Sequence, residues 1–282
     1  MRYGFFDNSY TLAEKGYTGS DRLSIQQFIT MGLIFIAIIV VSIFLKKLKK
    51  EKVFTIYKVI AIVMPILEII KIVFSSLSDI SHGEPFNYGG ILPLYSCSML
   101  LYFLPFVAWG KGKIQRWSMA FFVSIGLVAG LSNFVYLSAA GWYPLFTYGC
   151  LHSIIFHAAI VFVGMSLMIT EIYIPSFKTI YEGMIPILLF SVIVLPANFI
   201  IQNMPNPGSS PDYMMLMNAN GFIPFISDFF INNHIQILFS LLMLFVAYPL
   251  ATTLITLVDI GIYNLIKRLF KNKERKEPVL SE

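Results

Sequence analysis

Seven long apolar stretches constrain this chain more than any other feature of its sequence. A transmembrane helix needs roughly 20 apolar residues to cross about 30 Å of hydrocarbon. The stretches that come close to this length are 27–45, 54–76, 92–109, 117–137, 150–172, 180–201 and 234–258. Hydrophobic residues make up 57% of the 282 residues and charged residues only 12%, about half the charged share of a soluble domain. The sequence therefore predicts an all-α membrane protein, folded as a seven-transmembrane helix bundle.

We expect the seven stretches to form a single domain, because no internal repeat divides them. The predicted organisation is an extracytoplasmic N-terminal segment over 1–26, the seven-helix domain over 27–269 and a basic cytoplasmic tail over 270–282. The N-terminal segment lacks a charged start followed by an apolar core, so we expect no cleavable signal peptide. The third stretch is short, and Pro93 is expected in the first turn of its helix, where a missing N–H costs nothing.

Basic residues between the stretches predict the orientation of the bundle. Lysine and arginine gather in cytoplasmic loops, and here they follow stretches one, three, five and seven. They are Lys46, Lys47, Lys49, Lys50, Lys52, Lys111, Lys113, Arg116, Lys178, Lys267, Arg268, Lys271, Lys273, Arg275 and Lys276. The loops 77–91, 138–149 and 202–233 contain neither residue type. We therefore predict a multi-pass cell-membrane protein with its N-terminus outside and its C-terminus inside.

Composition and motifs also exclude several classes of ligand. The net charge of +5 comes from short clusters between apolar stretches, which is typical of a membrane orientation signal, so we expect no nucleic-acid partner. Two cysteines without a CxxC spacing predict no structural zinc. The sequence has no glycine-rich phosphate loop. We therefore expect no metal and no cofactor, and we expect membrane lipid to be both the solvent and the candidate substrate.

Polar side chains inside the stretches indicate the candidate functional region, because burying them in hydrocarbon is costly. They are Glu68, Lys71, Cys97, Asn133, His152, His157 and Asn198, and all fall in the predicted outer half of the bundle. At about 1.5 Å per helical residue, Cys97 lies roughly 8 Å below the outer end of its stretch and His157 roughly 11 Å. This one-sided distribution favours a site reached from outside over an alternating-access carrier.

The charged pair and the two histidines each leave alternatives open. Glu68 and Lys71 lie three residues apart on one helical face, so they form either a structural ion pair or part of a catalytic or proton-transfer site. His152 and His157 lie five residues apart, which turns their directions by about 140°. We expect one of them, the deeper His157, to face the centre and the other to lie near the headgroups, and we do not expect them to share a metal ion.

Cys97 allows three interpretations. A free cysteine is commonly a small buried hydrophobic residue. Cys97 and Cys150 both lie near the predicted outer face and can pair as a disulfide in an oxidising compartment. As a nucleophile, Cys97 needs a base that forms the thiolate, and a histidine of the fifth stretch is the candidate for that base.

Several segments resemble the YwaF-like family of integral membrane proteins, and the resemblance covers roughly residues 25–260. The segment 92–98, Leu-Pro-Leu-Tyr-Ser-Cys-Ser, is similar to the family's Leu-Pro-aromatic/His-x-Cys-Ser element. The segment 151–157, which contains both histidines, supports the match at the start of the fifth stretch. The segments 196–199 and 212–216 resemble the family's Asn-Tyr-x-x-x-Leu-rich region.

This resemblance implies an activity and a set of site residues. A eukaryotic relative is an acyltransferase that remodels ether phospholipids with a cysteine in the third-span element. By resemblance, Cys97 is the acyl-accepting nucleophile and His157 or His152 is its base. The chain departs from the family pattern at Tyr95, where His or Gln is frequent. Tyr95 can donate a hydrogen bond but is not a base near neutral pH.

Three hypotheses on function follow. The first is a membrane-embedded, cysteine-dependent lipid acyltransferase or acyl hydrolase in which Asn198 or Asn133 stabilises the oxyanion. The second is a non-enzymatic seven-span protein that binds or transports a small molecule or ion, with Glu68, Lys71 and the histidines as its site. The third is a structural membrane protein whose polar residues only join the helices. The loop 202–233 is expected either to cover the site as a lid or to rest on the headgroups.

Overall fold

The computed structural model describes residues 3–84, 87–204, 212–217 and 236–274. These residues form helices joined by turns, with no strand among them. The elements in chain order are α1 (Ser9–Glu14), α2 (Ile25–Leu45), α3 (Lys50–Ser81), α4 (Tyr88–Ile91), η1 (Ser96–Ser98), α5 (Met99–Trp109), α6 (Gly112–Val123), α7 (Ile125–Val135), η2 (Ser138–Gly141), α8 (Tyr148–Ile169), α9 (Lys178–Gln202), η3 (Tyr213–Met215), α11 (Gln236–Leu242), η5 (Met243–Ala247) and α12 (Tyr248–Glu274). The predicted all-α fold is confirmed for this part of the chain.

Within the described residues, seven helical segments are long and apolar enough to cross a membrane. They are Ile25–Leu45, Lys50–Ser81, Tyr88–Trp109, Gly112–Gly141, Tyr148–Ile169, Lys178–Gln202 and Gln236–Leu265. Each overlaps one of the seven predicted stretches, so the predicted number of spans is confirmed. The helix α3 extends beyond the predicted 54–76 at both ends, because its backbone hydrogen bonding continues into the polar residues that flank the apolar run.

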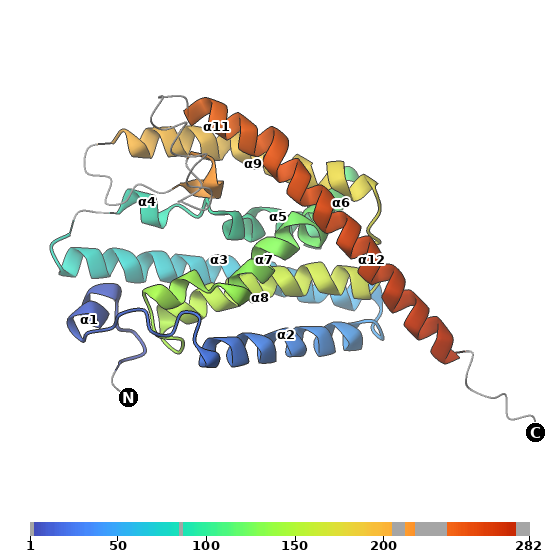
Figure 1. Cartoon of the computed structure of the whole chain (residues 1–282), viewed down its shortest axis with the longest axis horizontal. Helices are drawn as coiled ribbons and strands as arrows, with labels where there is room; N and C mark the ends of the chain where they lie inside the picture. The colour runs from blue at the N-terminus through green and yellow to red at the C-terminus, as the bar shows by residue number, and fades with distance from the viewer. Residues whose placement is uncertain (1–2, 85–86, 205–211, 218–235, 275–282) are drawn as a thin grey trace, which may run out of the picture.

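The long helices lie roughly side by side, and α12 crosses the others obliquely (Figure 1). The helix α8 lies inside the bundle, where it packs against α2, α3, α6 and α7. One end of the bundle carries α1, α4 and the start of α2, and we call it the N-terminal end (Figure 1). The other end carries the end of α2 and the starts of α6 and α9, and we call it the basic end because Lys46, Lys113 and Lys178 lie there.

Two glycines allow close contact between helices in the middle of the bundle. A Cβ atom at Gly164 of α8 would collide with the carbonyl oxygen of Phe122, and one at Gly183 of α9 would collide with the hydroxyl of Ser124. Small residues let transmembrane helices approach closely. The helices α8 and α9 therefore both converge on the break between α6 and α7, where the Ser124 hydroxyl donates to the Ala120 carbonyl over 2.7 Å.

The third span is broken, and its break differs from the sequence prediction. The helix α4 ends at Ile91 and α5 begins only at Met99, so Pro93 lies in the non-helical segment between them. The expectation that Pro93 occupies the first turn of a helix is wrong. The residue before a proline is disfavoured in the α region, and Leu92 accordingly has an extended backbone with ψ of 122°. Non-helical backbone at membrane depth is tolerated where it lines a cavity or is buried in protein.

Most of the loop 202–233, predicted as a lid or an interfacial loop, lies outside the described residues. Its described segment 212–217 is held inside the bundle, and Tyr213 and Leu216 have no exposed surface. The N-terminal segment also packs on the bundle. The Tyr17 hydroxyl donates to the Ala140 carbonyl over 2.5 Å, so this segment covers the N-terminal end.

Candidate active site

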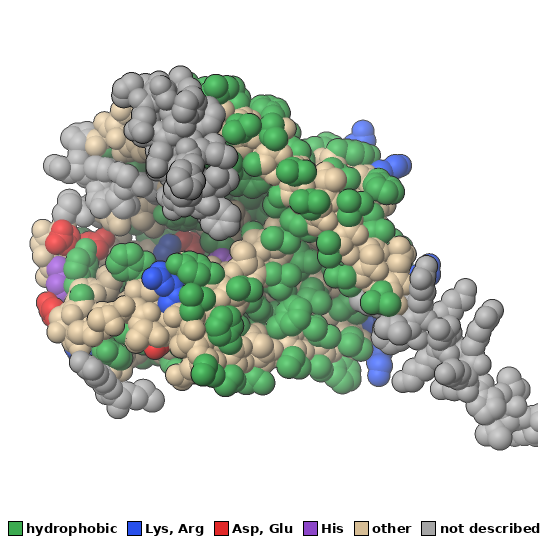
Figure 2. All heavy atoms as spheres, in the orientation of Figure 1, with side chains coloured by type: hydrophobic (Ala, Val, Ile, Leu, Met, Phe, Trp, Pro, Cys, Tyr) green, Lys and Arg blue, Asp and Glu red, His purple; other side chains and the backbone are tan. Residues whose placement is uncertain are grey.

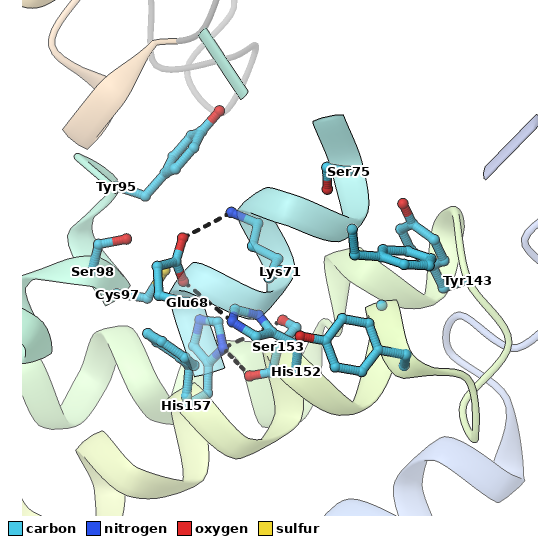
Figure 3. A pocket seen from close by; sticks show the side chains of 14 residues that line it. Glu68, Lys71, Ser75, Tyr95, Cys97, Ser98, Tyr143, His152, Ser153 and His157 are labelled. Atoms are coloured by element: carbon cyan, nitrogen blue, oxygen red, sulfur yellow. Dashed lines mark hydrogen bonds and ion pairs between the residues drawn. The ribbon is translucent and has the colours of Figure 1, made fainter. Parts of the chain in front are cut away.

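The break in the third span opens onto a cavity of about 200 Å³ between η1, α3 and α8. The lining residues labelled in Figure 3 are Glu68, Lys71, Ser75, Tyr95, Cys97, Ser98, Tyr143, His152, Ser153 and His157. Six of the residues predicted from the sequence therefore meet in one cavity. They are Tyr95 and Cys97 from the third span, Glu68 and Lys71 from α3, and His152 and His157 from α8.

Glu68 pairs with Lys71 on its own helix α3 and contacts His152 on α8. The side chain of Glu68 is buried, and its Oε1 lies 3.0 Å from the Lys71 ammonium on the same helix face. Its Oε2 lies 3.2 Å from Nε2 of His152, a close contact that does not meet hydrogen-bond geometry. Because a buried carboxylate is costly unless it is paired, these two contacts stabilise the Glu68 carboxylate inside the bundle.

The ring of His157 is fixed by its own helix. Its Nδ1 lies 2.7 Å from the Ser153 carbonyl oxygen one turn earlier, as Figure 3 shows. A carbonyl oxygen only accepts a hydrogen bond, so Nδ1 carries the proton. In the neutral ring Nε2 then keeps its lone pair, which is the arrangement that a general base needs.

Both histidines line the cavity, which differs from the expectation that only one of them faces the centre. The angle of about 140° separates their directions on α8, but α3 lies against α8 and brings Glu68 to His152. The His152 ring also packs against the Phe156 ring in a tilted arrangement, with 4.4 Å between the ring centroids. The contact with Glu68 of α3 therefore accounts for the position of His152 at the cavity.

Cys97 lies in η1, two residues before α5 begins, and its side chain is half-buried at the cavity wall. Both cysteines are free thiols, and Cys150 is fully buried. The alternative of a Cys97–Cys150 disulfide is therefore wrong for this structure. The interpretation of Cys97 as a purely buried hydrophobic residue also fits less well, because charged and imidazole side chains surround the same cavity.

The structure brings neither predicted asparagine to the cavity. The side-chain amide of Asn198 is fully buried and donates to the Tyr213 carbonyl over 3.1 Å, while its oxygen accepts the Tyr213 N–H over 3.0 Å. Asn133 has a buried side-chain oxygen that has no partner among the described residues. Both side chains are thus placed away from the position where they were expected to stabilise an oxyanion.

The segment 212–217, called the roof segment below, lies next to the cavity and contacts its lining residue Tyr95. The ring of Tyr213 packs edge-on against Tyr95, with 4.9 Å between the centroids, and its hydroxyl donates to the Gly89 carbonyl. The Tyr248 hydroxyl of α12 donates to the Met214 carbonyl over 2.6 Å. Met214 has a left-handed backbone with φ of 56°, which is uncommon outside glycine. These bonds hold that strained turn in place.

A second cleft of about 200 Å³ adjoins the cavity at the N-terminal end and shares Phe74, Ser75 and Tyr143 with it. Its further lining is more polar and consists of Asn8, Ser9, Tyr10, Ser78, Asp79, Asn87, Gly90 and Ile91. The Tyr10 hydroxyl donates to Asp79 over 3.2 Å, and the buried Ser78 hydroxyl has no partner among the described residues. The cavity and the cleft thus lie next to each other, and the lining of the cleft is the more polar of the two.

Two tyrosines of this cleft stay protonated over the physiological range. Burial raises the pKa of Tyr143 above its ordinary value, with a further increase from the charge of Asp79. Burial, followed by the charge of Asp79, likewise raises the pKa of Tyr10. A phenol that keeps its proton is a hydrogen-bond donor, and the Tyr10 hydroxyl uses its proton for the bond to Asp79.

Sequence reasoning missed several residues that line the cavity. Ser153 precedes His157 by one helical turn, a spacing that could have indicated it. Tyr148 is the first residue of α8 and likewise precedes His152 by one helical turn, whereas Tyr143 carries no such signal, because it lies before α8 begins. Among the described residues, no group of three His, Cys, Asp or Glu side chains is arranged for a metal ion, so we assign no metal ligands.

These features define a multi-pass helical membrane protein in which a free thiol, two imidazoles and an ion-paired carboxylate share an intramembrane cavity. The model of the TMEM164 family matches residues 22–252, most of the chain and all of the cavity residues named above. The protein therefore belongs to the TMEM164 family. No curated protein and no solved structure matches the chain.

Proposed function

We propose that this protein is a membrane-embedded, cysteine-dependent lipid acyltransferase or acyl hydrolase. The observation that carries the proposal is the placement of Cys97 at a helix break, in one cavity with a histidine whose Nε2 is free to accept a proton. A nucleophile and a base in a shared site are the minimum requirement for acyl transfer through a thioester. The resemblance of segment 92–98 to the YwaF-like family, with its acyltransferase relative, supports the same reaction.

In the first half-reaction, His157 Nε2 accepts the Cys97 thiol proton and the thiolate attacks the carbonyl carbon of a lipid ester. The C–S bond forms, the C–O bond to the lipid alcohol breaks, and His157 returns the proton to the leaving alkoxide. In the second half-reaction, His157 accepts the proton of an acceptor hydroxyl, or of water in a hydrolase. The new C–O bond forms as the C–S bond breaks, and the released thiolate recovers its proton.

Lys71 and Ser98 supply the positive charge and the hydrogen-bond donor that this reaction needs. Both line the cavity beside Cys97, whereas the predicted Asn133 and Asn198 do not. The Lys71 ammonium is held by Glu68 and can stabilise a developing oxyanion or a lipid phosphate. Glu68 also holds His152, so we assign His152 a supporting role and His157 the role of base.

The shape of the site supports a lipid as substrate. Figure 2 shows a hollow on the long side of the bundle, with basic, acidic and histidine side chains at its bottom and hydrophobic side chains beside it. Since this side faces hydrocarbon when the helices span a bilayer, a lipid ester can enter sideways with its tails in the membrane. The adjoining polar cleft then offers Asp79, Tyr10 and Asn87 to the headgroup.

We also infer that the N-terminal end faces outside and the basic end faces the cytoplasm, in a cell membrane. The loops at the basic end carry the lysines and arginines, as the positive-inside rule requires. The cavity then lies in the outer half of the bilayer, where lipid of the outer leaflet reaches it.

The second candidate function is binding or transport of a small molecule or ion without catalysis. The observation in its favour is the buried network of Glu68, Lys71 and His152, because ionisable groups within spans often form transport sites. Binding or transport does not need the Cys97 thiol, so the experiment below distinguishes this function from acyl transfer.

The test is detection of the thioester on the full-length protein. We would incubate the purified protein with a phospholipid that carries an isotope-labelled acyl chain and measure the acyl mass on each cysteine by mass spectrometry. The expected result is a hydroxylamine-sensitive acyl group on Cys97 that Cys97→Ser abolishes. His157→Gln should slow its formation by roughly 10²- to 10⁴-fold.

Cys150→Ser is the matched control, because Cys150 is a buried thiol outside the cavity. The Cys150→Ser protein should form the Cys97 thioester at the wild-type rate. Lipid turnover by Cys97→Ser at the wild-type rate would contradict the proposal. Uptake of a solute that is insensitive to Cys97→Ser would favour the transport function.

A further inference from the structure

A second site lies at the basic end, between the ends of α2 and α8 and the second half of α12. Its rim consists of Lys46, Glu171, Tyr263 and Lys267, and its floor of Met165, Met168, Ile169 and Ile262. The rim is therefore polar with one net positive charge, and the floor is apolar. We propose that this site binds one anionic phospholipid of the leaflet at the basic end, with the phosphate at the two lysines and an acyl chain on the floor.

The charges on the rim favour an anion. Lys46 pairs with Glu171 over 3.2 Å, and both side chains are about half exposed. Lys267 has no ion pair within the described part of the chain, and the Tyr263 phenol lies beside it in the site. Basic pockets between transmembrane helices bind anionic lipid headgroups. A phosphate can therefore contact Lys267 directly and compete with Glu171 for Lys46.

The backbone conformation of Glu171 indicates that the position of its carboxylate in the rim has a functional role. Glu171 follows the end of α8 with a left-handed backbone of φ 57°, a position that glycine usually occupies because it has no Cβ. A glutamate there carries a conformational cost and places a carboxylate against Lys46. In the absence of an anion, Glu171 therefore neutralises Lys46 and sets how tightly an anion binds.

The size of the site and its position favour a lipid over a larger soluble anion. The cavity volume is about 40 Å³, which exceeds the roughly 10–15 Å³ that one water needs and suits a phosphate-sized group. The apolar floor continues into the lipid-facing surface, because Ile262 is exposed. The family match covers the part of the site on α2 and α8 but ends at residue 252, before Tyr263 and Lys267.

The test is lipid retention by the full-length protein in detergent, measured by native mass spectrometry with phosphatidylglycerol or phosphatidylcholine. We expect one phosphatidylglycerol molecule to remain bound to the protein and phosphatidylcholine not to be retained. The double variant Lys46→Gln/Lys267→Gln should weaken the binding by roughly tenfold or more, since each surface lysine contributes to anionic lipid affinity. Glu171→Gly should strengthen it, because it removes the carboxylate that pairs with Lys46 and relieves the left-handed backbone.

Lys113→Gln is the control, since Lys113 lies at the same end outside this site. An equal loss in Lys113→Gln, or equal retention of both lipids, would overturn the proposal. Met168→Trp should fill the floor and remove the lipid, and displacement of the lipid by inorganic phosphate alone would instead indicate a site for a free anion. A thermal unfolding transition is measured for every variant, and a transition like that of the wild type shows that the fold is intact.

Discussion

Glu68 illustrates how one buried carboxylate connects the proposed chemistry to the fold. It contacts Lys71 on its own helix and His152 on α8, so it can act as a structural ion pair, as a positioning residue for the site, or as both. The two roles affect different measurements. A structural role changes the free energy of unfolding, whereas a positioning role changes the rate at which Cys97 is acylated.

We predict that Glu68→Gln affects both quantities. Loss of the carboxylate leaves Lys71 and His152 without a charged partner in the bundle, so the free energy of unfolding should fall by about 1–3 kcal/mol. Cys97 acylation should also slow by more than the folded fraction accounts for. Thermal unfolding and thioester formation, measured on the same sample, check the two effects.

Lys71→Gln provides the comparison, because it removes the other member of the pair. If the double variant is less destabilised than the sum of the two single variants, the residues are coupled. Wild-type acylation in a folded Glu68→Gln protein would restrict Glu68 to a structural role.

The residues of the cavity could largely be predicted from the sequence, but the contacts between them could not. Polar side chains in apolar stretches stand out because hydrocarbon disfavours them, and this criterion identified Glu68, Lys71, Cys97, His152 and His157. The same criterion identified Asn198, which instead bonds the backbone of Tyr213. A polar residue in a span must find a partner, and the sequence does not say whether that partner is a ligand or a loop.

The segment 212–217 depends on three helices for its position. Asn198 of α9 pairs with Tyr213, Ser240 of α11 donates to the Leu216 carbonyl over 2.7 Å, and Tyr248 of α12 donates to the Met214 carbonyl. A short loop with few internal bonds is thereby fixed beside Tyr95. The last spans thus contribute to the cavity through this segment.

We predict that Asn198→Ala loosens the segment. It leaves the buried N–H and carbonyl of Tyr213 without partners, so the free energy of unfolding should fall by about 1–3 kcal/mol. A water-soluble maleimide should then label Cys97 faster, because the roof segment opens more often. Asn203→Ala is the control, since Asn203 is exposed on the same helix end and bonds only the Phe199 carbonyl. Equal labelling rates in wild type and Asn198→Ala would contradict a covering role for the segment.

Most of the basic residues outside the spans lie at the basic end of the bundle, whereas the N-terminal segment carries only Arg2, Lys15 and Arg22, and this asymmetry predicts the orientation. Glu84 is exposed at the N-terminal end and Lys113 is exposed at the basic end. In a protein without its native cysteines, a single cysteine at either position reports which side of the membrane that end faces.

We predict that Glu84→Cys reacts with a membrane-impermeant maleimide in intact cells, whereas Lys113→Cys reacts only after permeabilisation. Positive loops stay on the cytoplasmic side during insertion, which gives the expected pattern. A permeant maleimide should label both variants and controls for accessibility. The reverse pattern would place the cavity in the inner half of the membrane and require lipid entry from the cytoplasmic leaflet.

The sequence by itself determined the membrane class, the number of spans and the charged, imidazole and thiol side chains of the cavity. These follow from the length and hydrophobicity of local stretches, because a span must satisfy its own backbone and match the bilayer. Only the tertiary structure decided that the third span breaks before Cys97, that His152 turns to Glu68, and that Asn198 turns to Tyr213. These outcomes depend on how helices distant in sequence pack against one another, and the spacing of residues along one helix does not encode that packing.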